Sequence, residues 1–238
     1  LTLFPMYALP QEPSVLLQVG FIVLAMSLVI GLAIVVRSYR IGLLAGAWLI
    51  LTGLAGATEV LADFTSMPPR PVFLLVPLSL LIVFIPRSPL GRSLVALPLR
   101  LLVGFQAFRI LVEMLIHQAV VEGVAPPQLS WSGLNLDIIS GVTALILMSF
   151  VNRVPRRVLI AWNGTAAFLL AWVVGVALLS MPSPAQQLTP DNVWIAYFPF
   201  IWLPAIYVLF AAVGHVVLFQ KVRAMGKAAR PVHSGEPI

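Results

Sequence analysis

Four polar side chains recur within one long apolar stretch of the sequence, LLVGFQAFRILVEMLIH, as Gln106, Arg109, Glu113 and His117. If the stretch is helical, their three- and four-residue spacing places them within roughly 80° of one helix face. Charged groups are costly in the hydrocarbon region of a membrane, so they normally face a bundle interior and find partners there. The stripe therefore indicates a site for ligand binding, proton transfer or ion pairing, but it names no reaction.

Two neighbouring segments are expected to bring further polar groups to this stripe. Glu59 and Asp63 lie four residues apart near the end of the second apolar stretch. Asn135 and Asp137 stand at the start of the fifth stretch, where a helix dipole suits a carboxylate. We expect an outward-facing polar pocket between the second, fourth and fifth spans. Its candidate ligand-binding residues are Arg109, Glu113, His117, Glu59, Asp63, Gln106, Asn135 and Asp137.

Three classes of function are open for this pocket. A binding protein for a small molecule or ion, of transporter or sensor type, would use Arg109 for an anionic group or a carboxylate counter-ion. In that case Glu113 and Glu59 would exchange protons or hold a cation, and His117 would tune them near neutral pH. We favour this class, because the cluster contains more acids than bases. Some carboxylates therefore have no basic partner even when every base forms an ion pair.

The second class is an intramembrane enzyme, with Glu113 and His117 as acid and base and Arg109 stabilising an oxyanion. It ranks lower, because the sequence shows no nucleophile beside these residues. The third class is an accessory subunit of a larger membrane complex, in which the cluster is a structural ion-pair network. A narrow, sealed cluster would favour the third class, and a wide, wet cavity would favour the first.

Arg109 is expected to contact Glu113, one helical turn away, and also a carboxylate on another helix. Glu59 is our first choice for that carboxylate, since a lone buried guanidinium is costly and Glu113 satisfies only part of its donor fork. His215 has no carboxylate within helical reach, so we interpret it as a packing histidine. Asn163 is expected to form a hydrogen bond across helices or to the backbone.

No metal and no cofactor are expected. The pairs Glu59/Asp63 and Glu113/His117 have the four-residue spacing of metal ligands, but the Glu-x-x-His repeat of di-metal bundles is absent. The sequence contains no cysteine, which excludes disulfides, a thiolate nucleophile and cysteine-ligated metal centres.

The composition defines the class of protein. Of the 238 residues, 61% are hydrophobic and 9% are charged, whereas soluble domains average about 25% charged. The mean hydropathy of +1.04 predicts an all-α, polytopic membrane protein. The net charge of +6 does not indicate nucleic-acid binding, because the basic residues lie in short loops between apolar stretches.

About seven spanning helices are expected, each of about 20 apolar residues. They form one transmembrane domain over residues 1–219, followed by a basic tail at 220–238 that we expect to be disordered. Pro98 is expected to break the first turn of the fourth span, and Pro199 and Pro204 to bend the seventh. The spans are expected at 15–36, 41–64, 72–85, 94–121, 134–150, 158–179 and 193–219.

The basic residues predict an N-terminus outside and a C-terminus in the cytoplasm of a bacterial-type inner membrane, because cytoplasmic loops are enriched in lysine and arginine. In this predicted topology, Arg70 is the one basic residue in a loop on the outer side of the membrane. Trp131, Trp194 and Tyr197 are expected in an outer aromatic belt. The partners expected are membrane lipids, an unknown small molecule or ion, and either a membrane-protein partner or further copies of the chain. The cytoplasmic cations would be Arg37, Arg40, Arg87, Arg92, Arg153, Arg156, Arg157, Lys221, Arg223, Lys227 and Arg230.

Residues of the fourth to seventh spans resemble a group of uncharacterised bacterial multi-pass integral membrane proteins. The resemblance implies a membrane location and no particular activity. It rests on Phe108, Arg109, Val112, Glu113, Gly123, Pro126, Pro127, Gly133, Asn135, Asp137, Ile138, Gly141, Thr143 and Ala144, and on the run from Phe198 to Pro204.

Overall fold

The first two helices follow the apolar stretches of the sequence and are bounded by local capping signals. Helix α1 (Val15–Val36) begins where the Ser14 hydroxyl accepts a hydrogen bond from the Leu17 amide, and it ends at Arg37 with φ 53°. Helix α2 (Tyr39–Ala57) is capped in the same way by Ser38. The predicted bounds of the first span are confirmed, whereas α2 ends seven residues before the predicted end at residue 64.

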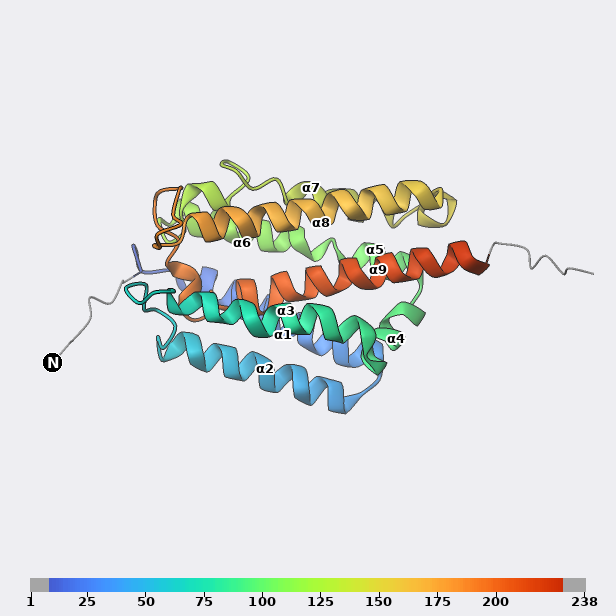
Figure 1. Ribbon diagram of the computed structural model, residues 1–238, viewed down its shortest axis with the longest axis horizontal. Coiled ribbons are helices and arrows are strands. Elements are labelled where there is room, and N and C mark those ends of the chain that lie inside the picture. Colours follow the sequence, from blue (N-terminus) through green and yellow to red (C-terminus); the bar gives the residue numbers. More distant parts are fainter. Residues whose placement is uncertain (1–8, 229–238) are drawn as a thin grey trace, which may run out of the picture.

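The computed structural model describes residues 9–228, which contain helices and turns and no strand. Figure 1 shows helices lying side by side along the long axis, with α9 packed against α8 on one side and α3 on the other. The other helices are α3 (Leu75–Phe84), α4 (Pro89–Ala96), α5 (Leu99–Phe105), α6 (Phe108–Val121), α7 (Ile138–Leu147), α8 (Arg156–Leu179) and α9 (Leu209–Ala228). A π-helical turn at Leu203–Val208 leads into α9, and short 3-10 turns lie at Arg70–Leu74, Ile85–Arg87, Pro127–Leu129, Val151–Arg153 and Trp194–Ala196.

The described residues contain five helical segments that are long and apolar enough to cross a membrane, or six if a bent pair counts as one span. The bent pair, Pro89–Ala96 and Leu99–Val121, turns by 107° at Pro98, where a break was predicted. The seven predicted spans are not confirmed. Helix α7 has only 10 residues and measures about 15 Å, half of a bilayer core of about 30 Å.

The last predicted span is displaced along the chain. Residues 193–201 contain turns and the short 3-10 segment Trp194–Ala196, and Pro204 occupies the first turn of the π-helical segment, where its missing N–H is tolerated. The predicted bend at Pro199 and Pro204 is therefore wrong. The helical segment begins at Leu203, so Pro199 precedes it and Pro204 is its second residue. Helix α9 continues to Ala228, so residues 220–228 are helical rather than disordered, and residues 229–238 of the predicted tail lie outside the described part.

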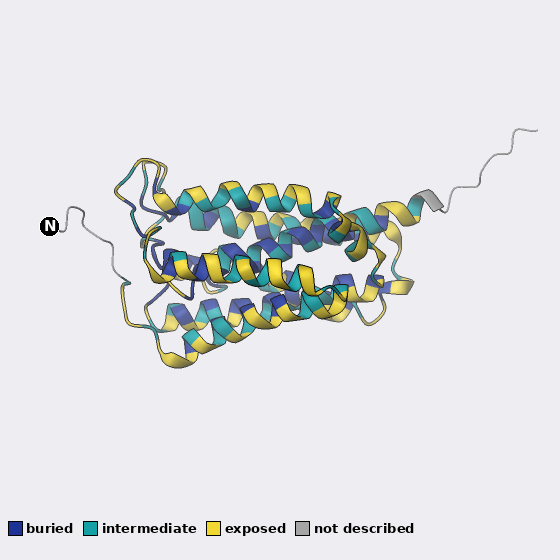
Figure 2. Ribbon diagram, turned by 90° about the horizontal axis from the view of Figure 1, so that it is seen from below, coloured by how far each residue is buried: buried dark blue, intermediate teal, exposed yellow. Residues whose placement is uncertain are grey.

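The buried side chains lie between the helices, while the outer faces are largely exposed, as Figure 2 shows. Many exposed residues are large and apolar, including Leu43, Leu44 and Ile50 on α2. Soluble monomers do not expose apolar surface on this scale, so these faces are suited to contact with lipid.

The predicted outer aromatic belt is wrong for two of its three members. Trp194 is 0% exposed and Tyr197 is 6% exposed. Trp194 instead packs edge-on against Phe21, and Phe21 also contacts Phe200. The Tyr207 hydroxyl donates to the Phe21 carbonyl over 2.6 Å, so these aromatic rings form part of the core between α1 and the segment that leads into α9.

Helix α4 can cross the end of the bundle because Gly91 lets it approach the preceding turn. A Cβ atom at Gly91 would lie 2.4 Å from the Ile85 carbonyl oxygen and 2.4 Å from the Pro86 carbonyl carbon. These are backbone atoms and have little freedom to move away. The position therefore requires glycine for reasons of space.

We expect Gly91→Ala to lower the free energy of unfolding by about 1–3 kcal/mol, because the added methyl group overpacks a backbone contact. The measurement is thermal melting of the purified protein in detergent. Gly46→Ala is the matched control, because a Cβ there meets nothing within 4 Å, and it should leave stability unchanged or raise it by up to about 1 kcal/mol. Equal melting temperatures for the two variants would contradict the interpretation.

Candidate functional site

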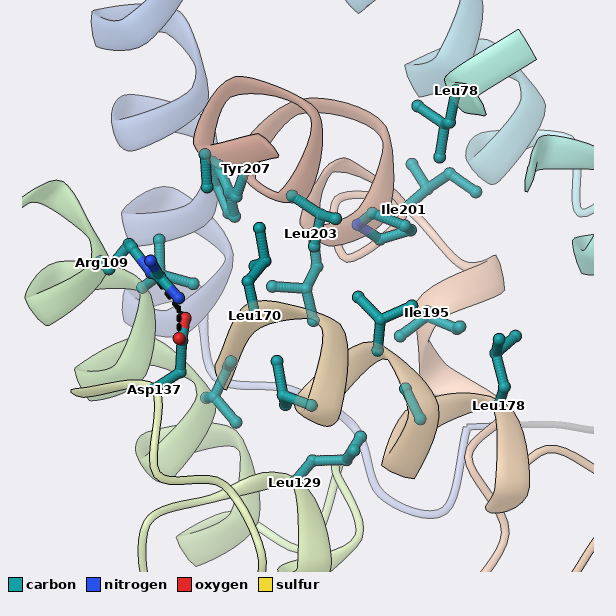
Figure 3. Close-up of a pocket in the computed structure, with 18 of the residues that line it drawn as sticks. Leu78, Arg109, Leu129, Asp137, Leu170, Leu178, Ile195, Ile201, Leu203 and Tyr207 are labelled. Atoms are coloured by element: carbon teal, nitrogen blue, oxygen red, sulfur yellow. Dashed lines mark hydrogen bonds and ion pairs between the residues drawn. The ribbon is translucent and has the colours of Figure 1, made fainter. Parts of the chain in front are cut away.

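Arg109 lies at the centre of a buried polar network in the half of the bundle formed by α6 to α9. Its Nε donates to Asp137 Oδ2 over 2.6 Å, and its Nη2 forms an ion pair with Asp137 Oδ1. Figure 3 shows the two side chains facing each other from α6 and the start of α7. The Nη2 group also donates to the Ala166 carbonyl of α8 over 3.3 Å. The pair is bidentate, which is the strongest geometry for a guanidinium and a carboxylate.

His215 of α9 completes the partners of Arg109. Its Nε2 lies 2.8 Å from Arg109 Nη1, and its Nδ1 lies 2.8 Å from Asn163 Oδ1. Because a guanidinium only donates, Nε2 must accept, and the histidine is therefore the neutral tautomer that carries its proton on Nδ1. Asn163 Nδ2 in turn donates to the His215 carbonyl over 3.1 Å. Each of the three nitrogens of Arg109 thus has a partner.

Glu113 lies beside this network but forms no ion pair with any residue that the structure describes. Its two carboxylate oxygens accept from Asn135 Nδ2 over 2.9 and 2.8 Å. Asn135 Oδ1 accepts from the Asp137 amide over 2.8 Å, so Asn135 links the two carboxylates. In the described part of the chain, ion pairs within 4 Å are formed by Arg109 with Asp137 and by Arg70 with Asp63. Glu113 is 2% exposed and is therefore a buried carboxyl group without a cationic partner at contact distance.

Arg109 does contact a carboxylate from another segment, but the choice of Glu59 is wrong, and so is the expected ion pair with Glu113. Helix α2 ends at Ala57, and Glu59 has φ 55°, so the chain turns away from the helix before Glu59. Glu59 lies near Tyr197, whose pKa is raised by burial and by the charge of Glu59. The predicted helical pair Glu59/Asp63 therefore does not form.

Asp63 holds the loop between α2 and α3 instead of joining the cluster. Its Oδ1 accepts from the Thr65 hydroxyl over 2.8 Å and from the Thr65 and Ser66 amides, and its Oδ2 lies 3.1 Å from Arg70 Nε. The hydrogen bond from the Thr65 hydroxyl is the largest cause that lowers the pKa of Asp63, and the charge of Arg70 acts in the same direction. The expected pocket between the second, fourth and fifth spans is thus replaced by a site between α6, α7, α8 and α9.

Gln106 and His117 lie at the two ends of the predicted stripe, each with different neighbours. Gln106 is buried at the break between α5 and α6, where its Nε2 donates to the Ala211 carbonyl over 3.3 Å. His117 stacks on Trp131 with 4.2 Å between ring centroids, and its Nδ1 lies 3.0 Å from the Ser130 hydroxyl. The four residues share a helix face, but the break after Gln106 separates it from the Arg109 network.

The contact between His117 and Ser130 places a hydroxyl beside the histidine, which the sequence did not indicate. Ser130 is fully buried, and its hydroxyl also accepts from the Ser132 hydroxyl over 3.4 Å. It therefore holds the loop together and is not accessible to a substrate as a nucleophile. Within residues 9–228, no group of three or more His, Asp or Glu side chains could hold a metal ion.

A cavity of about 110 Å³ borders the polar network between α3, α6, α8 and the start of α9. Figure 3 shows Arg109 and Asp137 at one side of this cavity and leucine and isoleucine side chains around the remainder. Glu113 also lines it. The apolar part of the lining includes Leu78, Val112, Leu170, Val174, Ile201 and Tyr207.

Comparison of the chain with protein-family models, curated proteins and solved structures finds no match. The resemblance to bacterial membrane proteins therefore stays an expectation, and the function must be argued from the site.

Sequence reasoning missed His215 as a partner of Arg109 and treated Asn163 only as a general hydrogen-bonding residue. Both were visible as polar residues inside apolar stretches, which in membranes normally indicates a buried partner. The sequence did not indicate which of them faces Arg109. His215 lies 106 residues further along the chain, so no local spacing relates the two residues.

We expect Arg109→Ala to lower the free energy of unfolding by about 3–5 kcal/mol, because it leaves the Asp137 carboxylate buried and unpaired. Adding Asp137→Asn to Arg109→Ala should restore part of this loss by removing the uncompensated charge. Glu113→Gln should change stability by less than about 1 kcal/mol, since it keeps shape and most hydrogen bonding. Thermal melting of the purified variants in detergent measures all three.

A loss for Glu113→Gln as large as that for Arg109→Ala would make Glu113 part of the structural network. A double variant no more stable than Arg109→Ala would show that the unpaired carboxylate is not the cause of the loss.

Proposed function

We propose that this chain crosses a bacterial cytoplasmic membrane seven times, with its N-terminus outside and its C-terminus inside. The support is the distribution of charge along the bundle. The α1–α2, α3–α4 and α7–α8 connections and the end of α9 lie at one end in Figure 1, and these segments carry nearly all of the basic residues. Arg70 lies in the connection before α3, at the opposite end, and is paired with Asp63. On this proposal the short α7 spans with help from its flanking turns and local thinning of the bilayer.

Because the chain has no cysteine, single-cysteine variants test this topology directly. Ser132→Cys and Asn152→Cys place thiols at exposed positions in the α6–α7 and α7–α8 connections. A membrane-impermeant maleimide applied to intact cells should label Ser132→Cys and leave Asn152→Cys unlabelled until the cells are opened. Labelling of both variants in intact cells would refute the seven-span topology.

We further propose that the protein binds a small, largely apolar molecule that carries one cationic or hydrogen-bond-donating group. The observation that carries this proposal is Glu113, a buried carboxyl group that lines the cavity and has no cationic partner within 4 Å among the described residues. A carboxylate offers roughly four acceptor positions, and a single amide nitrogen, Asn135 Nδ2, contacts its two oxygens. Acceptor capacity therefore remains for a donor that enters the cavity.

The arrangement does not favour an anionic ligand. Arg109 was the expected anion-binding group, but its three nitrogens already contact Asp137, His215 and the Ala166 carbonyl.

The volume of the cavity limits the size of the ligand. At about 110 Å³ the cavity is somewhat smaller than the ~150 Å³ cavity that accommodates benzene in an engineered protein. The bound part of the ligand is therefore a group of a few heavy atoms. Binding of such a donor, or of a proton, at Glu113 is the step that a transporter and a sensor would share.

Propylamine, propanol and propionate are matched probes, because they share an apolar chain and differ in the terminal group. Propylamine should raise the melting temperature of the purified protein with saturation, and propionate should not, because it would meet the Glu113 carboxyl group. Glu113→Gln should abolish the effect of propylamine, and Glu12→Gln, at an exposed carboxylate outside the cavity, should retain it. Stabilisation of Glu113→Gln by propylamine, or equal stabilisation of the protein by propionate, would refute the proposal.

A second candidate function is an accessory subunit of a larger membrane complex. The observation that favours it is that the members of the Arg109 network satisfy one another inside the protein. Hydrogen bonds connect four buried side chains in a row, Asp137, Arg109, His215 and Asn163. On this proposal the network only holds α6, α7, α8 and α9 together. Purification in a mild detergent with one stoichiometric partner, and no response to the propyl probes, would support it over the binding protein.

A further inference from the structure

A second cavity lies at the other side of α9, away from the Arg109 network. It has a volume of about 330 Å³ and is bordered by α1, α4, α5 and α9. Apart from Ser27, its lining consists of apolar side chains and two glycines, Gly31 of α1 and Gly214 of α9. It is roughly twice as large as the ~150 Å³ apolar cavity that takes up benzene, so it has room for part of a hydrocarbon chain.

The cavity reaches the outer surface of the bundle. Three of its lining residues are exposed, namely Ser27, Val35 at 39% and Leu101 at 42%. These residues lie on α1 and α5, which border the cavity on that side. In a bilayer this surface faces lipid, so the molecules that meet the opening are lipids. An apolar cavity that stays empty loses the dispersion contacts that a hydrocarbon chain would supply.

Positive charge gathers near the end of this cavity that α4 closes. Arg37 follows the lining residue Val35 by two positions, Arg87 follows Ile85 by two, and Arg92 lies between Leu90 and Leu94 of α4. All three arginines are exposed, and none forms an ion pair with a carboxylate in the described part of the chain. Unpaired arginines at a membrane surface attract anionic lipid headgroups.

We infer that this cavity binds one acyl chain of an anionic phospholipid, taken from the leaflet at the end of the bundle where α4 lies. The chain enters beside Ser27 and Leu101, and the headgroup lies near Arg37, Arg87 and Arg92. Helix α4, which turns by 107° from the following helix, forms the floor of the cavity with Leu90 and Leu94. This site is separate from the cavity at Glu113 and does not depend on the function proposed for it.

Gly31 offers a way to fill the cavity without disturbing the fold. A Cβ atom at Gly31 meets nothing within 4 Å, and the residue lines the cavity, so Gly31→Leu places its side chain in the space of the lipid chain. Gly46→Leu is the matched control, because a Cβ there also meets nothing within 4 Å and the residue lines neither cavity. Ser27→Phe, which covers the opening, is a second variant in case Gly31→Leu does not fold.

The experiment uses the full chain in phosphatidylcholine vesicles with a minor fraction of phosphatidylglycerol whose acyl chain carries a photoactivatable diazirine. We expect cross-links on peptides of α1, α5 and α9 that line the cavity. Gly31→Leu, or Ser27→Phe in its place, should lower their yield by about tenfold or more, because the added side chain fills or covers the space. Gly46→Leu should leave it unchanged, and melting curves confirm that each variant is folded.

Three results would overturn the inference. The first is an equal yield of these cross-links in the original chain and in a folded cavity-filling variant. The second is an equal yield from a diazirine-labelled phosphatidylcholine, which would remove the role of the anionic headgroup. The double variant Arg87→Gln/Arg92→Gln should reduce the preference for phosphatidylglycerol while the cross-linked positions stay the same, and an undiminished preference would likewise contradict the assignment of the headgroup.

Discussion

The burial of one guanidinium group constrains the second half of the bundle. Arg109 is 2% exposed, and a guanidinium has donors only, so every partner must supply an acceptor. Those acceptors come from three other segments, namely Asp137 at the start of α7, the Ala166 carbonyl of α8 and His215 of α9. An uncompensated charge at this depth would be strongly destabilising, so these segments must pack around α6 in one arrangement.

The same requirement accounts for the short α7. Asn135 and Asp137 could have been part of a longer helix. Instead, the Asn135 side chain donates to Glu113 and the Asp137 side chain accepts from Arg109. The Asp137 amide also donates to Asn135 Oδ1, so the chain forms a tight polar turn before the helix begins at Ile138. The connection after α6 therefore contributes side chains to the site, and α7 is short because this polar turn precedes it.

The two cavities differ in the chemistry of their walls, although α9 contributes to both. The smaller cavity meets the carboxyl group of Glu113 and the Arg109–Asp137 pair. The larger cavity is apolar apart from Ser27 and lies next to helices whose ends carry arginines without an ion pair among the described residues. Gln106 lies between these regions, with its amide against Gly214 of the larger cavity and its backbone at the start of the segment that leads to Arg109. The cavity that contains charged groups and the apolar cavity thus lie on either side of the break between α5 and α6.

Local features of the sequence were sufficient for the class of protein and for several boundaries. Apolar composition indicated membrane helices, the first apolar stretch defined α1, and Pro98 marked a break. The spacing of Arg109 and Glu113 correctly predicted that both are buried on one face. These outcomes depend on hydrophobicity, backbone sterics and helical periodicity, which act over a few neighbouring residues.

The partners in the site were decided only by tertiary packing. Asp137, rather than Glu59, pairs with Arg109 because the chain leaves α2 at Ala57 and turns at Glu59, whereas the α6–α7 connection folds back onto α6. Trp194 is in the core rather than in an interfacial belt, because Phe21 and Phe200 surround it. Asp137 and His215 lie 28 and 106 residues from Arg109, and no local pattern specifies which acceptor reaches a buried donor over such separations. The sequence by itself determined that a charge is buried in this bundle, and the packing of helices distant along the chain decided what neutralises it.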